Sequence, residues 1–315
     1  MKEFKNKVVL VTGGTGSIGS EIVRQLLDSG VAQVRVFSRD EHKQHELKLE
    51  LKDKRVRYLI GDVRDRERLD FALRGVDICF HAAALKHVPI CEYNPFEAVK
   101  TNVVGTQNVI DASIKHNLER VVLISTDKAV SPESVLGASK LMAERLVTAA
   151  NLVTGPSRTL FSSVRFGNVL GSRGSVIHLW RSQIDQGGPV TVTDKRAVRY
   201  FMEIPEAVRL IFSASRLMKG GEIFVLKMAE RIIVEFAEEV IATYASGKKI
   251  KINFTGLRPG EKLREGLLTA GEATHALETK DLLIITPEDP LHLTKVKAYT
   301  YAGARPLKGT EYISG

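Results

Sequence analysis

Long hydrophobic runs are absent from this 315-residue sequence, because no apolar stretch reaches the roughly 18 residues that a membrane-spanning helix needs. The N-terminal residues lead directly into an apolar, β-rich segment without the pattern of a secretory signal peptide. Cysteine is scarce as well, since only Cys79 and Cys91 occur and their spacing is not that of metal ligands. We therefore expect a cytoplasmic protein with reduced thiols, no membrane span and no metal site.

A basic region interleaved with aromatic residues is also missing, although the net charge is +9. Without such a region or a nucleic-acid-binding motif, we predict no nucleic-acid partner, and a phosphate-rich small ligand explains the positive charge equally well. Internal repeats and low-complexity linkers are lacking too. With 43% hydrophobic residues, the chain can bury a large core, and its length favours one large domain with a smaller one.

Predicted strands and helices alternate along the first half of the chain. This pattern predicts an α/β fold with a Rossmann-type, doubly wound parallel sheet over residues 1–168. The pattern is less regular over residues 169–315, where we expect a smaller α/β substrate domain. Because no linker separates the two parts, we expect them to be interleaved, with part of residues 200–230 returning to the first.

A glycine-rich turn follows the first predicted strand, residues 7–12, and opens an amphipathic helix. Gly13, Gly16 and Gly19 would let the backbone approach a pyrophosphate, and the helix N-terminus would favour its negative charge. A plain structural turn is the alternative, but the strand before it and the helix after it favour a dinucleotide site.

The tip of the second predicted strand, residues 34–37, bears on the choice of dinucleotide. An enzyme that prefers NAD usually has an acidic residue there to hold the ribose 2′-hydroxyl. This sequence has Ser38 and Arg39, with Lys43 one helical turn later, so a 2′-phosphate would meet a hydroxyl and two cations. We therefore predict NADP rather than NAD; the alternative is that Arg39 and Lys43 form a solvated face. The complete predicted cofactor site consists of Gly13, Thr15, Gly16, Ser17, Ile18, Gly19, Ser38, Arg39, Lys43, Asp62, Val63, Ala82, Ala83 and Lys140.

Residues that can transfer protons follow the fifth predicted strand, residues 121–124. Asp127 and Lys128 come at its end, and Lys140 lies in the next predicted helix. The carboxyl ends of parallel strands are where α/β proteins place their chemistry, so we predict the catalytic centre here. Four residues before Lys140, where a tyrosine would share its helix face, the sequence has Leu136.

Two further loops carry groups suited to phosphate. Lys86 follows the fourth predicted strand, where it would either meet a substrate phosphate or lie in solvent. His87 precedes Val-Pro, a setting more typical of a packed histidine than of a catalytic one. Glycine, serine and asparagine residues surround Arg173 after the sixth predicted strand, which is compatible with a phosphate-binding loop; a plain turn is the alternative.

The glycine spacing, the strand-end Thr-Asp-Lys and the helix lysine together resemble the extended short-chain dehydrogenase/reductase superfamily. Within it, six segments look like the bacterial UDP-N-acetylglucosamine 4,6-dehydratases of polysaccharide and flagellin-sugar biosynthesis, over about residues 5 to 285. These segments are Ser38-Arg39-Asp40-Glu41, Ala84-Leu85-Lys86-His87-Val88-Pro89, Ser125-Thr126-Asp127-Lys128-Ala129-Val130, Arg165-Phe166-Gly167-Asn168-Val169, Arg199-Tyr200-Phe201-Met202 and Arg258-Pro259-Gly260-Glu261-Lys262.

The resemblance implies a substrate site and an oligomer. Asn168, Arg173, Arg199, Arg258 and Glu261 would hold the UDP moiety of UDP-N-acetylglucosamine, and Lys86 would lie near the sugar or the diphosphate. A homo-oligomer, dimeric or hexameric, is expected. The family has short soluble members with a Tyr-x-x-x-Lys pair and mostly membrane-anchored long members that lack the tyrosine. With Leu136, this chain resembles the catalytic part of the second kind, either as a soluble homologue or as a piece of a longer anchored protein.

The reaction implied by the resemblance is internally redox-neutral. NADP+ takes hydride from C4 of the hexose, the ketone acidifies the C5 proton, water leaves from C6, and the hydride returns to C6. The family assigns the C5 base to the lysine matching Lys128 and the acid to the aspartate matching Asp127. Lys140 would bind the nicotinamide ribose, and Thr126 would hydrogen-bond O4.

This chemistry requires shifted protonation states. A lysine with a pKa of about 10.4 must be neutral, and an aspartate with a pKa of about 3.9 must hold a proton. Burial moves both pKa values in the needed directions, and positive charge on Lys140 would lower that of Lys128 further. The same charge would lower the pKa of Asp127, so burial must outweigh it there.

A group must replace the missing tyrosine as the O4 base. Our hypothesis is that Asp127 enters as a carboxylate, takes the O4 proton and then gives it to the departing O6 hydroxyl. Members without the tyrosine are associated with retention at C5, which we therefore expect. The alternatives are a C5-inverting dehydratase, a UDP-sugar 4-epimerase, which needs no C5 base, and a nucleotide-binding regulator without turnover.

Overall fold

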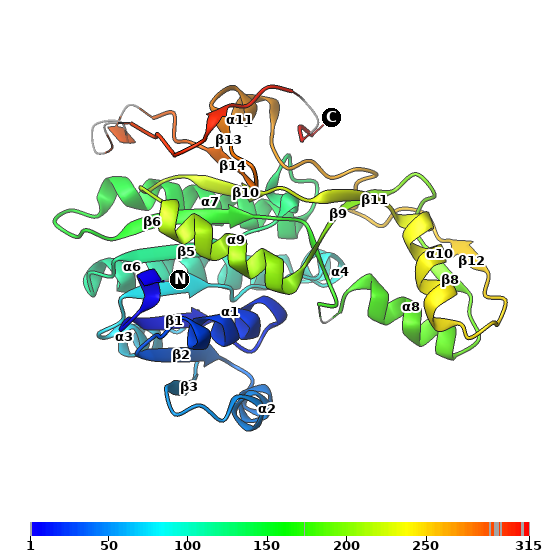
Figure 1. Cartoon of the computed structure of the whole chain (residues 1–315), viewed down its shortest axis with the longest axis horizontal. Helices are drawn as coiled ribbons and strands as arrows, with labels where there is room; N and C mark the ends of the chain where they lie inside the picture. Colours follow the sequence, from blue (N-terminus) through cyan, green and yellow to red (C-terminus); the bar gives the residue numbers. More distant parts are fainter. Residues whose placement is uncertain are drawn as a thin grey trace.

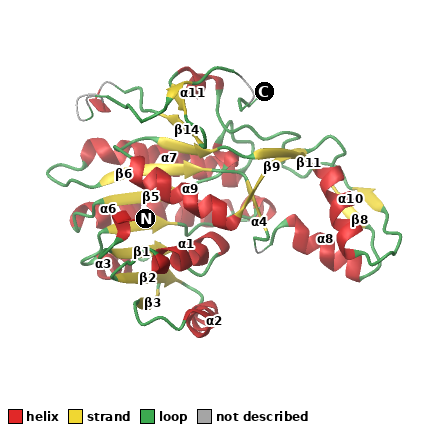
Figure 2. Cartoon of the chain, in the orientation of Figure 1, coloured by secondary structure: helices red, strands yellow, loops and turns green. Residues whose placement is uncertain are grey.

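The structure, a computed structural model, describes residues 2–172, 174–289, 291–292, 296, 298–309 and 312–314. A large mixed sheet dominates it, with helices on both faces (Figures 1 and 2). In the described part of the chain this sheet has ten strands, in the order β15-β13-β14-β10-β6-β5-β4-β1-β2-β3. The predicted fold class is confirmed.

The strands from β3 across to β10 run parallel, and β14, β13 and β15 add an antiparallel edge. Their bounds are β1 (Val8–Thr12), β2 (Gln33–Ser38), β3 (Val56–Ile60), β4 (Ile78–His81), β5 (Arg120–Ile124), β6 (Leu160–Arg165), β10 (Ile223–Leu226), β13 (Ala276–Glu278), β14 (Leu282–Ile285) and β15 (Arg305–Pro306). The order in which the chain adds strands reverses between β1 and its parallel neighbour β4, and such a switch point opens a crevice at the carboxyl ends of the strands.

Side chains that alternate along the strands supply two cores. Val9 and Val11 of β1 pack into a core that includes Phe212 of α9, while Leu10 points to a core that includes Val147 of α7. Since both faces are covered, strands such as β1 and β10 are apolar along nearly their whole length rather than alternating. The helices around this sheet are α1 (Ser17–Asp28), α2 (Glu41–Leu51), α3 (Arg66–Leu73), α6 (Gly105–Lys115), α7 (Val135–Val153) and α9 (Ile204–Leu217).

A smaller part extends from the carboxyl ends of the parallel strands (Figure 1). It contains β7 (Asn168–Leu170), β9 (Val198–Glu203) and β11 (Ala229–Ile232) in one sheet, and β8 (Val190–Val192) and β12 (Ile252–Phe254) in another. Trp180 of α8 (Val176–Asp185) and Phe236 of α10 (Ile233–Tyr244) form a third core between these elements. Between β9 and β11 the chain returns to the large sheet as α9 and β10.

Shorter elements complete the described chain: η1 (Lys2–Phe4), α4 (Val88–Tyr93), α5 (Pro95–Ala98), η2 (Val99–Val104), η3 (Asp127–Ala129) and α11 (Ala270–Thr274). The π-helical turn η2 interrupts the helical stretch between α5 and α6. Here the Asn102 amide bonds both backbone groups of Leu85 and the hydroxyl of Ser139. Among the described residues, no helix is both long and apolar enough to cross a bilayer.

Candidate active site

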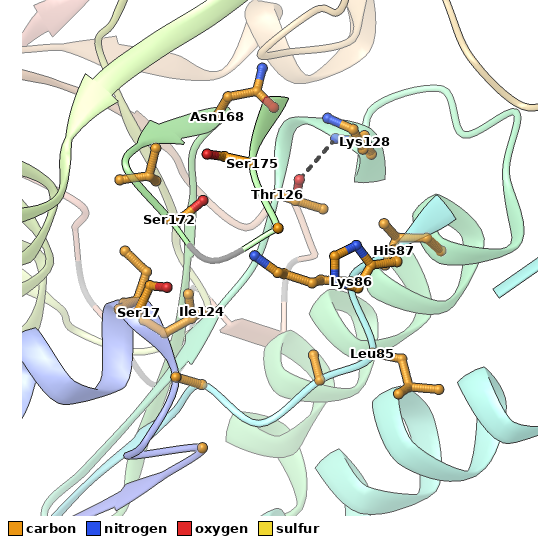
Figure 3. A pocket seen from close by; sticks show the side chains of 18 of the residues that line it. Ser17, Leu85, Lys86, His87, Ile124, Thr126, Lys128, Asn168, Ser172 and Ser175 are labelled. Atoms are coloured by element: carbon orange, nitrogen blue, oxygen red, sulfur yellow. Dashed lines mark hydrogen bonds between the residues drawn. The ribbon is translucent and has the colours of Figure 1, made fainter. Parts of the chain in front are cut away.

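A cavity of about 880 Å³ lies at the carboxyl ends of the parallel strands. Its walls come from the β1–α1 turn, the ends of β2 to β5 and, across from them, residues of β7, α8, β8 and β9. Figure 3 shows Ser17 at one end and Lys128 at the other, with Lys86 reaching between them. One cavity therefore brings most of the predicted cofactor and substrate residues together.

The glycine turn has the close packing that a dinucleotide site requires. Gly13 has a φ of +63°, and a Cβ there would lie 2.7 Å from the Ala83 nitrogen. A Cβ on Gly19 would lie 2.3 Å from the Gly13 oxygen, so α1 packs directly on the turn. Gly16 precedes α1 without a side-chain cap, leaving the positive end of the helix for an anion. The predicted residues Gly13, Thr15, Gly16, Ser17, Ile18, Gly19, Ala82 and Ala83 all line the cavity.

The other predicted cofactor residues lie at the neighbouring strand ends. Ser38, Arg39, Lys43, Asp62 and Val63 line the cavity. The hydroxyl of Ser38 is 2.7 Å from that of Thr15, which joins the tip of β2 to the glycine turn. Arg39 lies 3.6 Å from Asp62, and Lys43 pairs with Asp40, so both cations have carboxylate partners.

The predicted catalytic residues come from the end of β5 and from α7. Thr126, the N-cap of η3, and Lys128 line the cavity, whereas the Asp127 side chain is fully buried behind them. The Thr126 hydroxyl donates to Asp127 Oδ1 at 2.9 Å, and Lys128 Nζ donates to the same oxygen at 3.0 Å. Asp127 therefore contacts the hydroxyl of Thr126 and the amine of Lys128, the two residues that line the cavity.

Lys140 and Leu136 occupy successive turns of α7, and both line the cavity. Lys140 Nζ donates to the Ile124 carbonyl oxygen at 2.6 Å. Its burial lowers its pKa to about 8, with a small opposing effect from Glu144. Leu136 is 4% exposed and packs against Cys91 and Ala98. An apolar cluster therefore occupies the position at which a tyrosine would share the helix face of Lys140.

The charge environment of Lys128 differs from the one expected from sequence. Burial acts to lower its pKa, as expected, but the carboxylates of Asp127 and Glu265 outweigh burial and raise it. Glu265 Oε1 lies 3.7 Å from Lys128 Nζ. Sequence reasoning missed Glu265, because nothing in its local pattern indicates that residue 265 lies beside residue 128.

The predicted substrate residues line the opposite wall. Asn168, Arg199, Arg258 and Glu261 contribute to it, and Lys86 lines the cavity from the loop after β4. Arg199 Nη2 donates to Glu261 Oε1 at 2.9 Å, which fixes the β9 strand to the loop after residue 257. Arg173 lies outside the described residues. Sequence reasoning also missed the apolar part of this wall, which includes Trp180, Val192, Phe201 and Ile233.

A comparison with protein families matches residues 9–287 to a family described as polysaccharide biosynthesis protein. The chain belongs to this family. It is 51% identical over 289 residues to an uncharacterized membrane protein of Methanocaldococcus jannaschii, covering 90% of this chain and 87% of the other. It is 40% identical over 286 residues to a UDP-N-acetylglucosamine 4,6-dehydratase (inverting) of Campylobacter jejuni, covering 90% and 84%. A UDP-glucose 4-epimerase of Rickettsia canadensis is 39% identical, covering 99% and 92%.

Solved structures are also similar to this chain. The X-ray structure of Pen from Bacillus thuringiensis has a TM-score of 0.88 and 47% identity, covering 91% of this chain and 90% of the other. The dTDP-glucose 4,6-dehydratase DesIV of Streptomyces venezuelae, solved with NAD and TYD bound, has a TM-score of 0.74 and 26% identity, covering 84% and 88%. The proteins similar to this chain therefore include nucleotide-sugar dehydratases and an epimerase.

Proposed function

We propose that the protein is a UDP-N-acetylglucosamine 4,6-dehydratase of surface polysaccharide biosynthesis, giving a UDP-4-keto-6-deoxy-N-acetylhexosamine. The observation that carries this proposal is the meeting of Thr126, Asp127, Lys128 and Lys140 beside the glycine turn, facing a second wall that bears Asn168 and two arginines. Relatives named as nucleotide-sugar dehydratases and epimerases support the broader class, a nucleotide-sugar enzyme of this chemistry.

A nicotinamide dinucleotide fits the cavity next to β1 and β2. The glycine turn and the uncapped start of α1 would hold its pyrophosphate, and Lys140 would hold the nicotinamide ribose. When bound, the nicotinamide would accept hydride from C4 of the sugar and later return it to C6. We propose NADP as the preferred form, because Arg39 follows β2, Lys43 lies in the first turn of α2, and no carboxylate stands at position 38 or 39.

The proton of O4 would pass through Thr126 to Asp127. Because Asp127 is fully buried and receives the Thr126 hydroxyl, its carboxylate is placed to accept a proton by way of that hydroxyl rather than from the sugar directly. In the elimination step the same route would run in reverse, delivering the proton to the departing O6 hydroxyl. One carboxylate would then serve as base and acid in turn, without the tyrosine that Leu136 replaces.

Lys128 would remove the C5 proton. Its amine lies in the cavity wall and is held by Asp127 Oδ1 at 3.0 Å. Since neighbouring carboxylates raise its pKa, the resting side chain is an ammonium and must lose a proton before it can act. A base of high pKa is well matched to a C–H proton, which a neighbouring ketone makes only weakly acidic.

The configuration at C5 separates two products. Retention is expected from the absence of the tyrosine, whereas the Campylobacter relative named as an inverting enzyme supports inversion. The Rickettsia relative supports the 4-epimerase alternative, against which the pairing of Asp127 with Lys128 argues, because epimerisation requires no base at C5. A binding protein without turnover would retain the dinucleotide and the UDP-sugar but give no product.

Proton NMR of UDP-N-acetylglucosamine incubated with the protein and NADP in D2O tests the proposal. We expect a new C6 methyl signal, deuterium at C5, and coupling constants that identify the C5 configuration. A C4-inverted sugar that keeps its C6 hydroxymethyl group would establish the epimerase instead. An unchanged substrate, with binding demonstrated separately, would leave the regulator as the correct alternative.

A further inference from the structure

A loop from the C-terminal third of the chain lies over the catalytic turn. The Lys262 amine donates to the Val130 carbonyl at 2.9 Å, one residue beyond η3. The Val198 amide donates to the Leu263 carbonyl at 2.9 Å, which ties the same loop to β9. These two bonds fix the loop just before Glu265. The side chain of Glu265 is therefore held toward the catalytic turn.

Glu265 is 5% exposed and does not line the cavity. Its Oε1 atom is 3.7 Å from Lys128 Nζ, and its Oε2 atom is buried without a hydrogen-bond partner among the described residues. Asp127 Oδ2 is likewise buried without a hydrogen-bond partner among the described residues. Lys128 thus pairs with two buried carboxylates, each of which leaves one oxygen unsatisfied.

A buried carboxylate is costly unless a cation compensates it. Two other cations lie near Glu265, but Arg199 is paired with Glu261 and Lys262 bonds backbone carbonyls. Burial raises the pKa of Glu265, and the Lys128 amine is the cation that opposes this most strongly. Glu265 in turn stabilises the charged form of Lys128. Burial and Arg199 lower the pKa of this lysine, whereas Asp127 and Glu265 raise it.

We propose that Glu265 is a positioning residue. Together with Asp127 it holds the Lys128 amine at the cavity wall and keeps it a strong base. The inference rests on the proposed role of Lys128 as the C5 base. Without Glu265, only Asp127 would raise the pKa of the Lys128 amine against burial and Arg199, which lower it. The amine would then be a weaker base that loses its proton at lower pH. Glu265 would influence the rate without touching the sugar.

Competitive acetylation of lysines, read by mass spectrometry across a pH series, tests the charge state without turnover. The Lys128 side chain is 23% exposed and lines the cavity, so a small reagent can reach it. In Glu265→Gln, which keeps the size of the side chain, we expect the labelling midpoint of Lys128 to move to lower pH, because one of the two carboxylates that raise its pKa is removed. An unchanged midpoint in the folded variant would overturn the inference.

Glu230→Gln is the matched control. Glu230 pairs with Arg264, the sequence neighbour of Glu265, but not with Lys128, so the midpoint should stay at the wild-type value. An equal shift in both variants would also refute a specific role for Glu265. If Glu265→Gln does not fold, Glu265→Asp carries the test, because it withdraws the carboxylate by one methylene and should give a smaller shift in the same direction.

Turnover provides the second readout. With UDP-N-acetylglucosamine as substrate, the rising limb of the kcat–pH profile should move to lower pH in Glu265→Gln, with a lower maximum and an unchanged KM. A rise in KM with an unmoved limb would indicate a purely structural role and contradict the inference. If the wild-type protein gives no product, the proposed function fails, and the labelling experiment still decides whether Glu265 controls Lys128.

Discussion

Replacing Lys140 by methionine should make the protein more stable at neutral pH while abolishing its activity. The Lys140 side chain is buried, and burial lowers the pKa of its amine from 10.5 to about 8. A shift of about 2.5 units corresponds to about 3 kcal/mol of destabilisation when the amine is charged. Methionine removes this cost but also the 2.6 Å bond to the Ile124 carbonyl, worth about 1 kcal/mol. We therefore expect Lys140→Met to raise the free energy of unfolding by about 2 kcal/mol at pH 7.

The pH dependence of this difference provides a sharper test than its size. Below pH 8 the native amine is charged, so the wild type bears the full cost. Between about pH 8 and 10.5, the unfolded chain binds a proton at this lysine and the native protein does not, so wild-type stability rises with pH. The advantage of Lys140→Met should consequently shrink over that range.

Denaturant unfolding of both proteins at pH 7, 8, 9 and 10 measures this difference, with Lys249→Met, at an exposed lysine, as the control. Glu144, the nearest carboxylate to act on Lys140, keeps its pairing with Arg165 in the variant and so leaves no new unpaired charge. A variant less stable than wild type at pH 7, or an advantage that does not change with pH, would refute the reasoning. Loss of turnover should be about 100-fold or more, because the ribose would lose its positioning group.

Substitutions at four other residues test the remaining parts of the site. Asp127→Asn should slow C4 oxidation by about 100-fold in a single-turnover NADPH absorbance assay, and a near-wild-type rate would exclude the carboxylate as the O4 base. In the same assay Thr126→Val should be similarly slow and Thr126→Ser close to wild type; equal rates for the two would exclude a relay through the hydroxyl. Arg39→Ala should raise KM for NADP by about tenfold or more and change KM for NAD little, whereas equal changes would contradict a 2′-phosphate contact. Gly13→Ala should abolish dinucleotide binding in a fluorescence titration, because its Cβ would lie 2.7 Å from the Ala83 nitrogen and its φ is +63°; retained affinity would show that the turn can adjust.

The sheet and the cofactor side of the cavity could be predicted from local sequence. The strands predicted over residues 7–12, 34–37 and 121–124 are β1, β2 and β5. These predictions succeed because hydrophobic periodicity is a local property and because parallel strands end at a common edge.

The protonation of the catalytic lysine could not be predicted in the same way. The prediction that burial would lower the pKa of Lys128 was wrong in its outcome, although burial does act in that direction. The deciding carboxylate belongs to Glu265, far along the chain, and reaches Lys128 only because the loop over the catalytic turn is bonded to Val130 and β9. A local pattern contains no information about such a neighbour.

The sequence by itself determined the α/β fold, the glycine turn and the set of groups at the strand ends, because these follow from periodicity and from the order of residues along single elements. Only the tertiary structure decided that Asp127 lies behind Thr126, that Leu136 belongs to an apolar cluster, and that Lys128 pairs with two carboxylates. The reason is physical: which groups are present is a property of the chain, whereas burial and electrostatic interaction depend on distances between segments that only folding brings together.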